Sequence, residues 1–418
     1  MTSNRHPLPT VPLSSAASRA LAELGRHAHA QEISELSGHQ LLMERAWLTG
    51  ARFQRGCSAG GSCRFLQCAD GVIALTMVRI SDWELVPAWL ELDGVDVSSP
   101  EARGWELLAS TVQDRGVDLL VDRARLLGLA IADAGNPAPT PSGYYRQLAS
   151  GPPPTPGSRP STGRPRVVDL SALWAGPLCG HLLHLCGAEV IKVESGHRPD
   201  GARAGNPAFY GLLNQGKRSV ELDLRNAEGC EALRALMLTA DIVIESSRPR
   251  ALEQMGIRAA DILRVRPGLT WISITGHGRE APQDNWIAFG DDAGVAAGLS
   301  EEMHTAIGSY QFAGDAIADP LTGIHGALAA WDSWQNGGNR LLSLSLTGVA
   351  AWCLAQERNR VGAEQVNRAF ADWWHHVYNH VSNAGKGDTG VDRQDRPIRD
   401  PVATQGEHTG QVMLTVRC

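Results

Sequence analysis

The 418-residue sequence predicts an α/β protein: a Rossmann-like, mainly parallel sheet domain preceded by a smaller α+β domain. Residues 137–165 are rich in Pro, Gly, Ser and Thr, a composition typical of a solvated linker. After this linker, short β-branched runs alternate with helical patterns, as expected for a parallel sheet covered on both faces. The length also exceeds the usual size of a single core, so two domains are expected.

The first domain, residues 1–136, mixes helices with strands. Residues 17–48 carry apolar side chains at helical spacing, and 102–132 contain two further amphipathic patterns. Val72 to Thr76 predicts a strand after the Asp70-Gly71 turn. We therefore expect a small α+β domain here.

The second domain, residues 166–350, opens with a strand, a Gly-Pro turn, a helix and a second strand over 166–194. Such a unit puts the unpaired N–H groups of a helix beside a strand end, where anionic ligands are favoured. Gly176 and Gly180 do not form G-x-G-x-x-G, which disfavours a nicotinamide enzyme. After 351 we expect a helical segment and a loose polar tail. Further strands are predicted at 219–222, 242–244 and 270–275, and further helices at 227–239 and 321–334.

Composition narrows the function classes. With 43% hydrophobic residues, 20% charged residues and a formal charge of −7, the chain has no general attraction for nucleic acid or anionic membranes. The first residues lack a signal-peptide pattern and no long apolar run follows, so a cytoplasmic location is expected. The eight cysteines are scattered, which favours reduced thiols and no metal site.

Seven segments resemble the family III CoA transferases of the CaiB/BaiF type, the group of the carnitine, bile-acid and formyl-CoA transferases. They follow the family's order over residues 166–347. The segments are DLSALWAGP (169–177), GAEVIKVE (187–194), the Asp200 to Arg203 turn, NQGKRSVELDL (214–224), ADIVIESSRPRALEQMG (240–256), ISITGHG (272–278) and GDAIADPLTG (314–323).

The resemblance implies a CoA transferase acting on an acyl-CoA and a carboxylic acid, with CoA as substrate and no separate cofactor. It also implies a homodimer, possibly interlocked. Three segments of the first domain are similar to the family's small domain, which would here precede the large domain in a permuted order. These segments are residues 56–75, 82–90 and 123–132.

Asp319 aligns with the family's catalytic aspartate in IADPLTG, and Asp315 is the fallback. A carboxylate there would form a mixed anhydride and then an aspartyl-CoA thioester. From the residues alone, Asp319 before Pro320 is also a good helix N-cap, which would lower the pKa of its carboxyl.

The resemblance also carries over a CoA and substrate site, with departures. An Asn-aromatic pair of the family is replaced by Ser246 and Ser247, Gln254 stands in place of an arginine, and Ser195 in place of a basic residue. Arg198, Arg203, Lys217, Arg218 and Arg248 are possible substitutes for the lost phosphate contacts. The carried-over residues are Leu173, Trp174, Ala175, Arg203, Lys217, Ser246, Ser247, Met255, Thr275 and His277.

Alternatives remain open. An acyl-CoA racemase or isomerase would use a histidine where this chain has Gly290-Asp291-Asp292. A non-catalytic paralogue or heteromer subunit would fit the replaced basic contacts. His376 and His380 share a helical face but lack the glutamate of a zinc motif, and the glycine-rich residues 56–63 form either a surface turn or an active-site lid. The sequence does not identify the acyl group or the acceptor.

Overall fold

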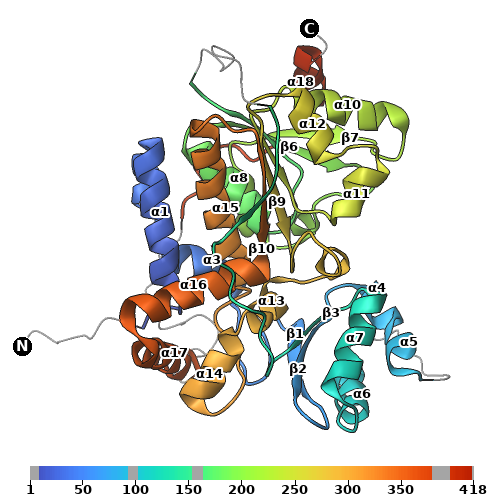
Figure 1. Cartoon of the computed structure of the whole chain (residues 1–418), viewed down its shortest axis with the longest axis vertical. Helices are drawn as coiled ribbons and strands as arrows, with labels where there is room; N and C mark the ends of the chain where they lie inside the picture. Colours follow the sequence, from blue (N-terminus) through green and yellow to red (C-terminus); the bar gives the residue numbers. More distant parts are fainter. Residues whose placement is uncertain (1–8, 93–101, 153–162, 379–395, 417–418) are drawn as a thin grey trace, which may run out of the picture.

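The structure is a computed structural model and describes residues 9–92, 102–152, 163–378 and 396–416. It contains a seven-stranded sheet and a separate three-stranded sheet, with helices packed around both (Figure 1). The mixed α/β class predicted from the sequence is confirmed. None of the helices within these ranges has both the length and the apolar character needed to cross a bilayer.

The large sheet has the strand order β4-β10-β9-β8-β5-β6-β7. All its pairs are parallel except β4 with β10 at one edge. From β5 the chain runs outward to β7 and then returns to the other side of β5, which is the Rossmann order with a switch point between β5 and β8. Its strands are β4 (Arg146–Ser150), β5 (Arg166–Asp169), β6 (Glu189–Ser195), β7 (Arg218–Leu222), β8 (Ile242–Glu245), β9 (Thr270–Thr275) and β10 (Arg340–Ser345).

Both faces of this sheet are buried. Val167 and Ile242 belong to one core with α8 (Ala175–Leu185) and α15 (Ala318–Gln335). Their sequence neighbours Val168 and Val243 point to the opposite face and a second core. This explains the continuous apolar runs of the central strands. The helices that contribute to this second core include α10 (Ala227–Leu238), α12 (Ala259–Val265) and α18 (Thr409–Val416).

The small domain has a core of its own around three antiparallel strands, in the order β1-β2-β3. Strand β2 has the bounds predicted from the sequence. The strands are β1 (Cys63–Gln67), β2 (Val72–Thr76) and β3 (Ala130–Asp133), and the helices are α4 (Ile80–Glu84), α5 (Val86–Leu90), α6 (Ala102–Val112) and α7 (Val117–Leu127).

The N-terminal helices do not belong to this small core, although residues 1–136 were expected to form one domain. Leu21 and Leu41 are fully buried in the core that contains α8 and α15, and α1 lies along α15 in Figure 1. An amphipathic pattern shows that a face is buried but not which partner covers it. The helices are α1 (Ser14–Ala28), α2 (Gln31–Ser34) and α3 (Gly38–Thr49).

Two further boundaries differ from the sequence prediction. Strand β4 lies within the expected linker. The prediction of a loose tail is wrong for residues 396–416, which include α18. Arg396 forms a buried bidentate ion pair with Glu44 at 2.7 and 2.8 Å, and α18 packs beside β7. The rest of the expected tail lies outside the described residues. The remaining α-helices are α9 (Pro207–Asn214), α11 (Pro249–Gln254), α13 (Gly290–Ala296), α14 (Leu299–Ile307), α16 (Leu346–Val361) and α17 (Ala363–His376).

Candidate active site

Asp319 lies in the first turn of α15, but it is not the helix cap. The helix begins at Ala318, with Ile317 in the cap position, so Pro320 occupies the third helical position. The N-cap prediction is therefore wrong. Proline is tolerated throughout a first turn, where N–H groups lack intrahelical partners, so the Asp-Pro pair does not fix the first residue.

A close approach of backbone surrounds this carboxylate. A Cβ atom on Gly290 would lie less than 3.0 Å from both Asp319 Oδ2 and the Ala316 carbonyl oxygen. Ala316 has a φ of 46°, a left-handed conformation that is costly for a residue with a side chain. Its N–H donates to Asp291 Oδ1 at 2.9 Å, and its carbonyl accepts from the Asp319 N–H at 2.9 Å. Asp291 thus helps to hold the turn that presents Asp319.

The charges around Asp319 favour its protonated form, whereas the sequence predicted a lowered pKa. Burial, with the carboxylates of Asp291 and Asp315, raises the pKa of Asp319 to about 7, against the opposing effects of Arg45 and the Gly290 N–H. Burial and the Asp315 charge likewise raise the pKa of Asp291 to about 6. The expectation that the helix N-terminus lowers the pKa of Asp319 is therefore wrong, because desolvation and like charges outweigh it.

The cation of this cluster comes from helix α3. The Arg45 Nε donates to Asp315 Oδ2 at 2.9 Å, a second guanidinium nitrogen donates to Oδ1, and the guanidinium carbon lies 4.7 Å from the centre of the Trp174 ring. The sequence alone gave no reason to place Arg45 here, because 270 residues separate it from Asp315.

The small domain also contacts this region. Thr76, at the end of β2, donates to Asp292 Oδ1 at 2.7 Å, and the Ser58 hydroxyl hydrogen-bonds to Asp291. Ser58 belongs to the glycine-rich segment 56–63, so that segment lies beside the carboxylates and not on a remote surface. This position is compatible with the lid hypothesis, which stays a prediction.

Leu173, Trp174 and Ala175, predicted as part of the CoA site, follow β5 at the switch point of the large sheet. Leu173 has a φ of 69°. Its N–H donates to Asp200 Oδ1 at 2.9 Å, and the nearby Ala172 N–H donates to Ser246 Oγ at 3.2 Å. Leu173 is 44% exposed, whereas Trp174 and Ala175 are buried. Ser246 and Ser247, after β8, are both partly exposed. The structure thus brings these predicted residues to one edge.

Three of the five proposed phosphate contacts already have carboxylate partners. Arg203 pairs bidentately with Glu194, Lys217 is buried against Asp169 at 2.9 Å, and Arg218 pairs with Glu189. The Lys217 ammonium also donates to the Pro177 carbonyl, so it serves the core rather than a bound phosphate. We therefore remove Lys217 from the candidate phosphate contacts.

The other two, Arg198 and Arg248, belong to an arginine cluster. Burial, together with the charges of Arg250, Arg79 and Arg198, lowers the pKa of Arg248. Arg198 follows β6, Arg248 follows β8, and Arg79 comes from the small domain just before α4. Among the described residues, no ion pair joins Arg198 or Arg248 to a carboxylate, whereas Arg79 pairs with Asp82. Sequence analysis missed Arg79 and Arg250 because the four arginines converge only in the fold.

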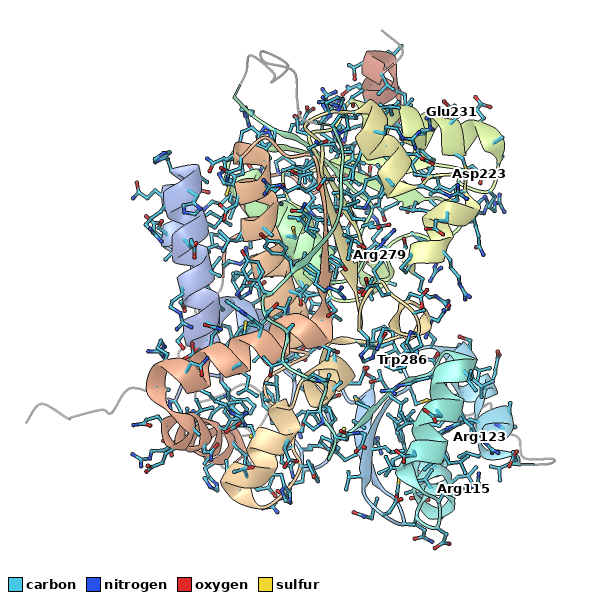
Figure 2. All side chains as sticks on the ribbon, in the orientation of Figure 1. Arg115, Arg123, Asp223, Glu231, Arg279 and Trp286 are labelled. Atoms are coloured by element: carbon cyan, nitrogen blue, oxygen red, sulfur yellow. The ribbon has the colours of Figure 1, made fainter. Side chains whose placement is uncertain are left out.

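The remaining predicted residues lie elsewhere on the large domain. Met255, after α11, packs against the core of the second face, and Thr275 ends β9. His277 hydrogen-bonds to Thr347 at 3.1 Å, and burial with the nearby Arg125 charge lowers its pKa to about 4. Trp286 lies at the boundary of the two domains (Figure 2), and the Arg125 guanidinium lies 3.8 Å from its ring centre.

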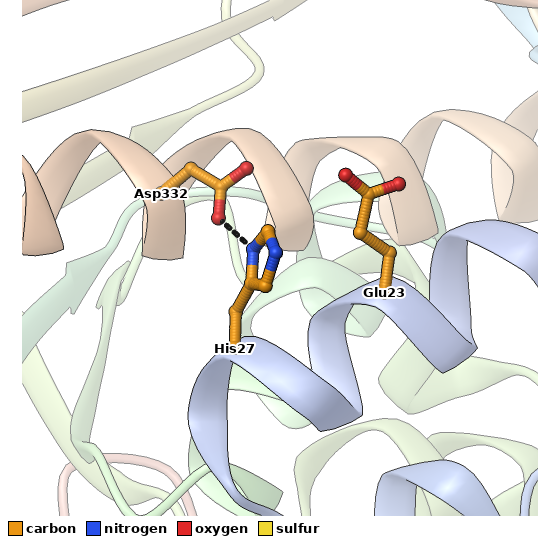
Figure 3. A group of neighbouring side chains, drawn as sticks. All are labelled: Glu23, His27 and Asp332. Carbon is orange, nitrogen blue, oxygen red and sulfur yellow. Dashed lines mark hydrogen bonds and ion pairs between the residues drawn. The ribbon is translucent and has the colours of Figure 1, made fainter.

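One further group of side chains has metal-ligand chemistry. Glu23 and His27 on α1 and Asp332 on α15 offer ligand atoms within 4.8 Å of one another (Figure 3). His27 Nδ1 and Asp332 Oδ1 are 2.5 Å apart, so this contact joins α1 to α15 directly. The second histidine of the 376/380 pair lies outside the described residues.

The fold and the carboxylate cluster around Asp319 define an α/β protein with a partly exposed aspartate in the first turn of a helix. Residues 165–369 match the model of CoA-transferase family III. The match contains Asp319, Asp291 and Asp315 but not Arg45, Ser58 or Thr76. The resemblance stated from the sequence is confirmed.

Curated relatives agree with this assignment. The chain is 31% identical over 219 residues to the succinate–glutarate CoA-transferase of Agrobacterium fabrum, covering 48% of this chain and 55% of that protein. It is 34% identical over 186 residues to the succinyl-CoA–D-citramalate CoA-transferase of Chloroflexus aurantiacus, covering 41% and 46%. The chain thus spans about half the length of the curated relatives it matches.

A solved structure of a CAIB/BAIF family protein from Brucella suis is 28% identical, with a TM-score of 0.42. That match covers 48% of this chain and 57% of the other.

Proposed function

We propose that this chain is a CoA transferase that moves CoA from an acyl-CoA donor to a carboxylic acid, with Asp319 as the nucleophile. The observation that carries the proposal is the placement of Asp319 in the first turn of α15, against Gly290 and within a charged cluster. The relatives' names support the reaction class. Asp319 lies inside the region that matches the family.

The chemistry requires no group beyond the two substrates and Asp319. The Asp319 carboxylate attacks the thioester carbonyl and expels CoA thiolate, which leaves a mixed anhydride. The thiolate then attacks the aspartyl carbonyl carbon of that anhydride, releasing the donor acid as its carboxylate and forming an aspartyl-CoA thioester. Attack by the acceptor carboxylate on this thioester and return of the thiolate to the acceptor's carbonyl release the new acyl-CoA and regenerate Asp319.

Each step passes through a tetrahedral oxyanion, so the protein contributes placement and positive electrostatic potential. The Gly290 N–H and the Arg45 guanidinium both favour negative charge at Asp319. Because the pKa of Asp319 is about 7, its reactive carboxylate form becomes dominant only above neutral pH. We therefore expect adduct formation to rise through about pH 7.

The arginine cluster supports binding of the CoA phosphates. Arg198 and Arg248 follow β6 and β8, the two strands that flank β5, and the charges of Arg79 and Arg250 also act on Arg248. Guanidinium groups bind phosphate through paired N–H donors, and four of them together repel one another unless an anion is present. This cluster offsets the basic contacts that the sequence lacks elsewhere.

A racemase is not favoured by the site. Asp291 stands where that reaction would use a histidine base, and its Oδ1 accepts from the Ala316 N–H. A homodimer and a cytoplasmic location remain predictions.

The test is trapping with hydroxylamine. Purified protein is incubated with a panel of acyl-CoAs and hydroxylamine, and peptides are examined by mass spectrometry in wild type and Asp319→Asn. A hydroxamate on the Asp319 peptide, absent from the variant, supports the transferase and identifies its donor. If no donor yields an adduct in folded wild type, the chain is a non-catalytic paralogue or one subunit of a heteromer.

Calorimetry with CoA tests the phosphate contacts separately. We expect Arg248→Gln to weaken CoA binding and to reduce its dependence on salt. Arg225→Gln is the matched control, because Arg225 is exposed and paired with Asp223. Equal affinities of wild type and Arg248→Gln would remove the arginine cluster from the CoA site.

A further inference from the structure

The turn that follows β5 is held by side chains from three segments of the large sheet. The backbone N–H groups of residues 171–173 donate, in order, to Asp169 Oδ1 at 3.0 Å, Ser246 Oγ at 3.2 Å and Asp200 Oδ1 at 2.9 Å. Free N–H groups before a helix commonly bind anions. Because these three donors already have acceptors, the turn presents its side chains to a ligand instead.

Leu173 has the unusual conformation in this turn. Its φ of 69° lies in the left-handed region, which is costly for a residue with a side chain. The side chain is nevertheless 44% exposed, and a Cβ atom on the nearby Gly201 would lie 3.4 Å from Leu173 Cδ2. A strained backbone persists only where its surroundings impose it, and such strain is concentrated at functional sites.

The carboxylate that binds the Leu173 N–H is itself buried and paired. The Asp200 side chain is 0% exposed, and its Oδ2 lies 2.8 Å from the ammonium nitrogen of Lys192, whose side chain is 2% exposed. Lys192 also donates to the Ser171 carbonyl at 2.9 Å, and the Asp200 N–H donates to Glu194 Oε1 at 3.0 Å. Asp200 could not turn away from Leu173 without disturbing a buried ion pair.

We propose that Asp200 is a positioning residue for the CoA site: its buried carboxylate holds the Leu173 backbone so that the Leu173 side chain forms an apolar contact with bound CoA. The proposal rests on the function proposed above, which brings CoA to this edge of the sheet. Ligands of open parallel sheets bind at the switch point, where Leu173 lies. CoA has an uncharged pantetheine arm and an adenine ring besides its phosphates, so an apolar contact complements the arginine cluster.

A purely structural Asp200 would behave differently. It would stabilise the fold through Lys192 without acting on the ligand. If Asp200 instead acts through the Leu173 side chain, removing Asp200 costs no further affinity once that side chain is gone. The affinity losses of two independent residues would add.

The experiment is a double-mutant cycle on CoA affinity, measured by calorimetry with the full chain. We expect Asp200→Ala and Leu173→Ala each to weaken CoA binding by about tenfold. The double variant should bind no more than about twofold more weakly than either single variant.

Asp241→Ala is the matched control. Asp241 is also buried, accepts the Arg166 N–H at 2.9 Å and pairs with Arg266 at 3.0 Å. It precedes β8, whereas Ser246 follows that strand, so Asp241 lies at the opposite edge of the sheet from the turn. Asp241→Ala should bind CoA as tightly as wild type.

Hydrogen exchange reports on the turn without any ligand. The Leu173 amide should exchange faster in Asp200→Ala, because its acceptor is gone. If Asp200→Ala does not fold with Lys192 left buried and unpaired, Lys192→Met/Asp200→Ala removes both charges and takes its place in the cycle.

Three results would overturn the positioning role while CoA still binds to wild type. These are wild-type affinity in the Asp200 variant, affinity losses that add in the double variant, and unchanged exchange of the Leu173 amide. Failure of wild type itself to bind CoA would instead refute the proposed function, and this proposal with it.

Discussion

Gly290→Ala is the most direct perturbation of the Asp319 environment. Gly290 is the first residue of α13, and an added Cβ would lie less than 3.0 Å from Asp319 Oδ2 and from the Ala316 carbonyl oxygen. The carbonyl belongs to a backbone already held at a φ of 46°, so it has little room to move. The Asp319 side chain is the part expected to turn away.

The same helix offers a matched control. A Cβ on Gly294 would meet Leu299 at 3.5 Å and Ile317 at 3.9 Å, which are ordinary van der Waals contacts. Alanine in a helix interior is better than glycine by about 0.5–1 kcal/mol, so Gly294→Ala should be neutral or slightly stabilising. Gly290→Ala gains no more than this and incurs an overpacking cost of about 1–3 kcal/mol.

Two measurements test this reasoning. Urea unfolding should give Gly290→Ala a free energy of unfolding below that of Gly294→Ala, and hydroxylamine trapping at Asp319 should be lost or greatly slowed only in Gly290→Ala. Full trapping in a Gly290→Ala protein as stable as its control would show that Asp319 does not depend on this close approach.

Two other predictions concern stability. Arg396→Met should destabilise the fold by about 3–5 kcal/mol in urea unfolding, because it leaves the buried Glu44 carboxylate without its partner; a loss below about 1 kcal/mol would mean that residues 396–416 are not docked. Burial raises the pKa of Asp292 from 3.8 to about 7, so its protonated form stabilises the folded state at low pH, and this contribution is lost as pH rises through 7. Between about pH 5 and about pH 8, the free energy of unfolding of wild type should therefore fall by on the order of 2 kcal/mol more than that of Asp292→Asn. Equal dependence of the unfolding free energy on pH in the two proteins would contradict this prediction.

The large sheet could be predicted because its central strands are continuous apolar runs separated by helical periods. Thr270 to Thr275 was predicted with the bounds observed, as was Val72 to Thr76 in the small domain. Strand β4 was missed because an edge strand in a Pro-rich segment has polar, exposed residues and no burial pattern. The N-terminal helices were correctly expected as helices, but their periodicity carried no information on which core they join.

The site was predicted in part for a similar reason. Asp319 stands in a local motif, so its position in the chain sufficed to find it. Arg45, Ser58 and Thr76 meet the carboxylates only through long-range packing, and no spacing in the sequence signals it. The predicted direction of the Asp319 pKa shift was wrong. The position of Asp319 near a helix N-terminus can be read from the sequence, whereas its burial and the proximity of Asp291 and Asp315 cannot.

The charge balance of the site explains why both halves of the chain matter to it. The family-matched half brings together Asp291, Asp315 and Asp319, which by themselves would repel one another and bind protons. The N-terminal half adds the compensating Arg45 and the hydroxyl of Ser58. With a pKa near 7, Asp319 is partly ionised at neutral pH. It is not held in a strong ion pair, because Arg45 binds Asp315 and leaves Asp319 available to a substrate.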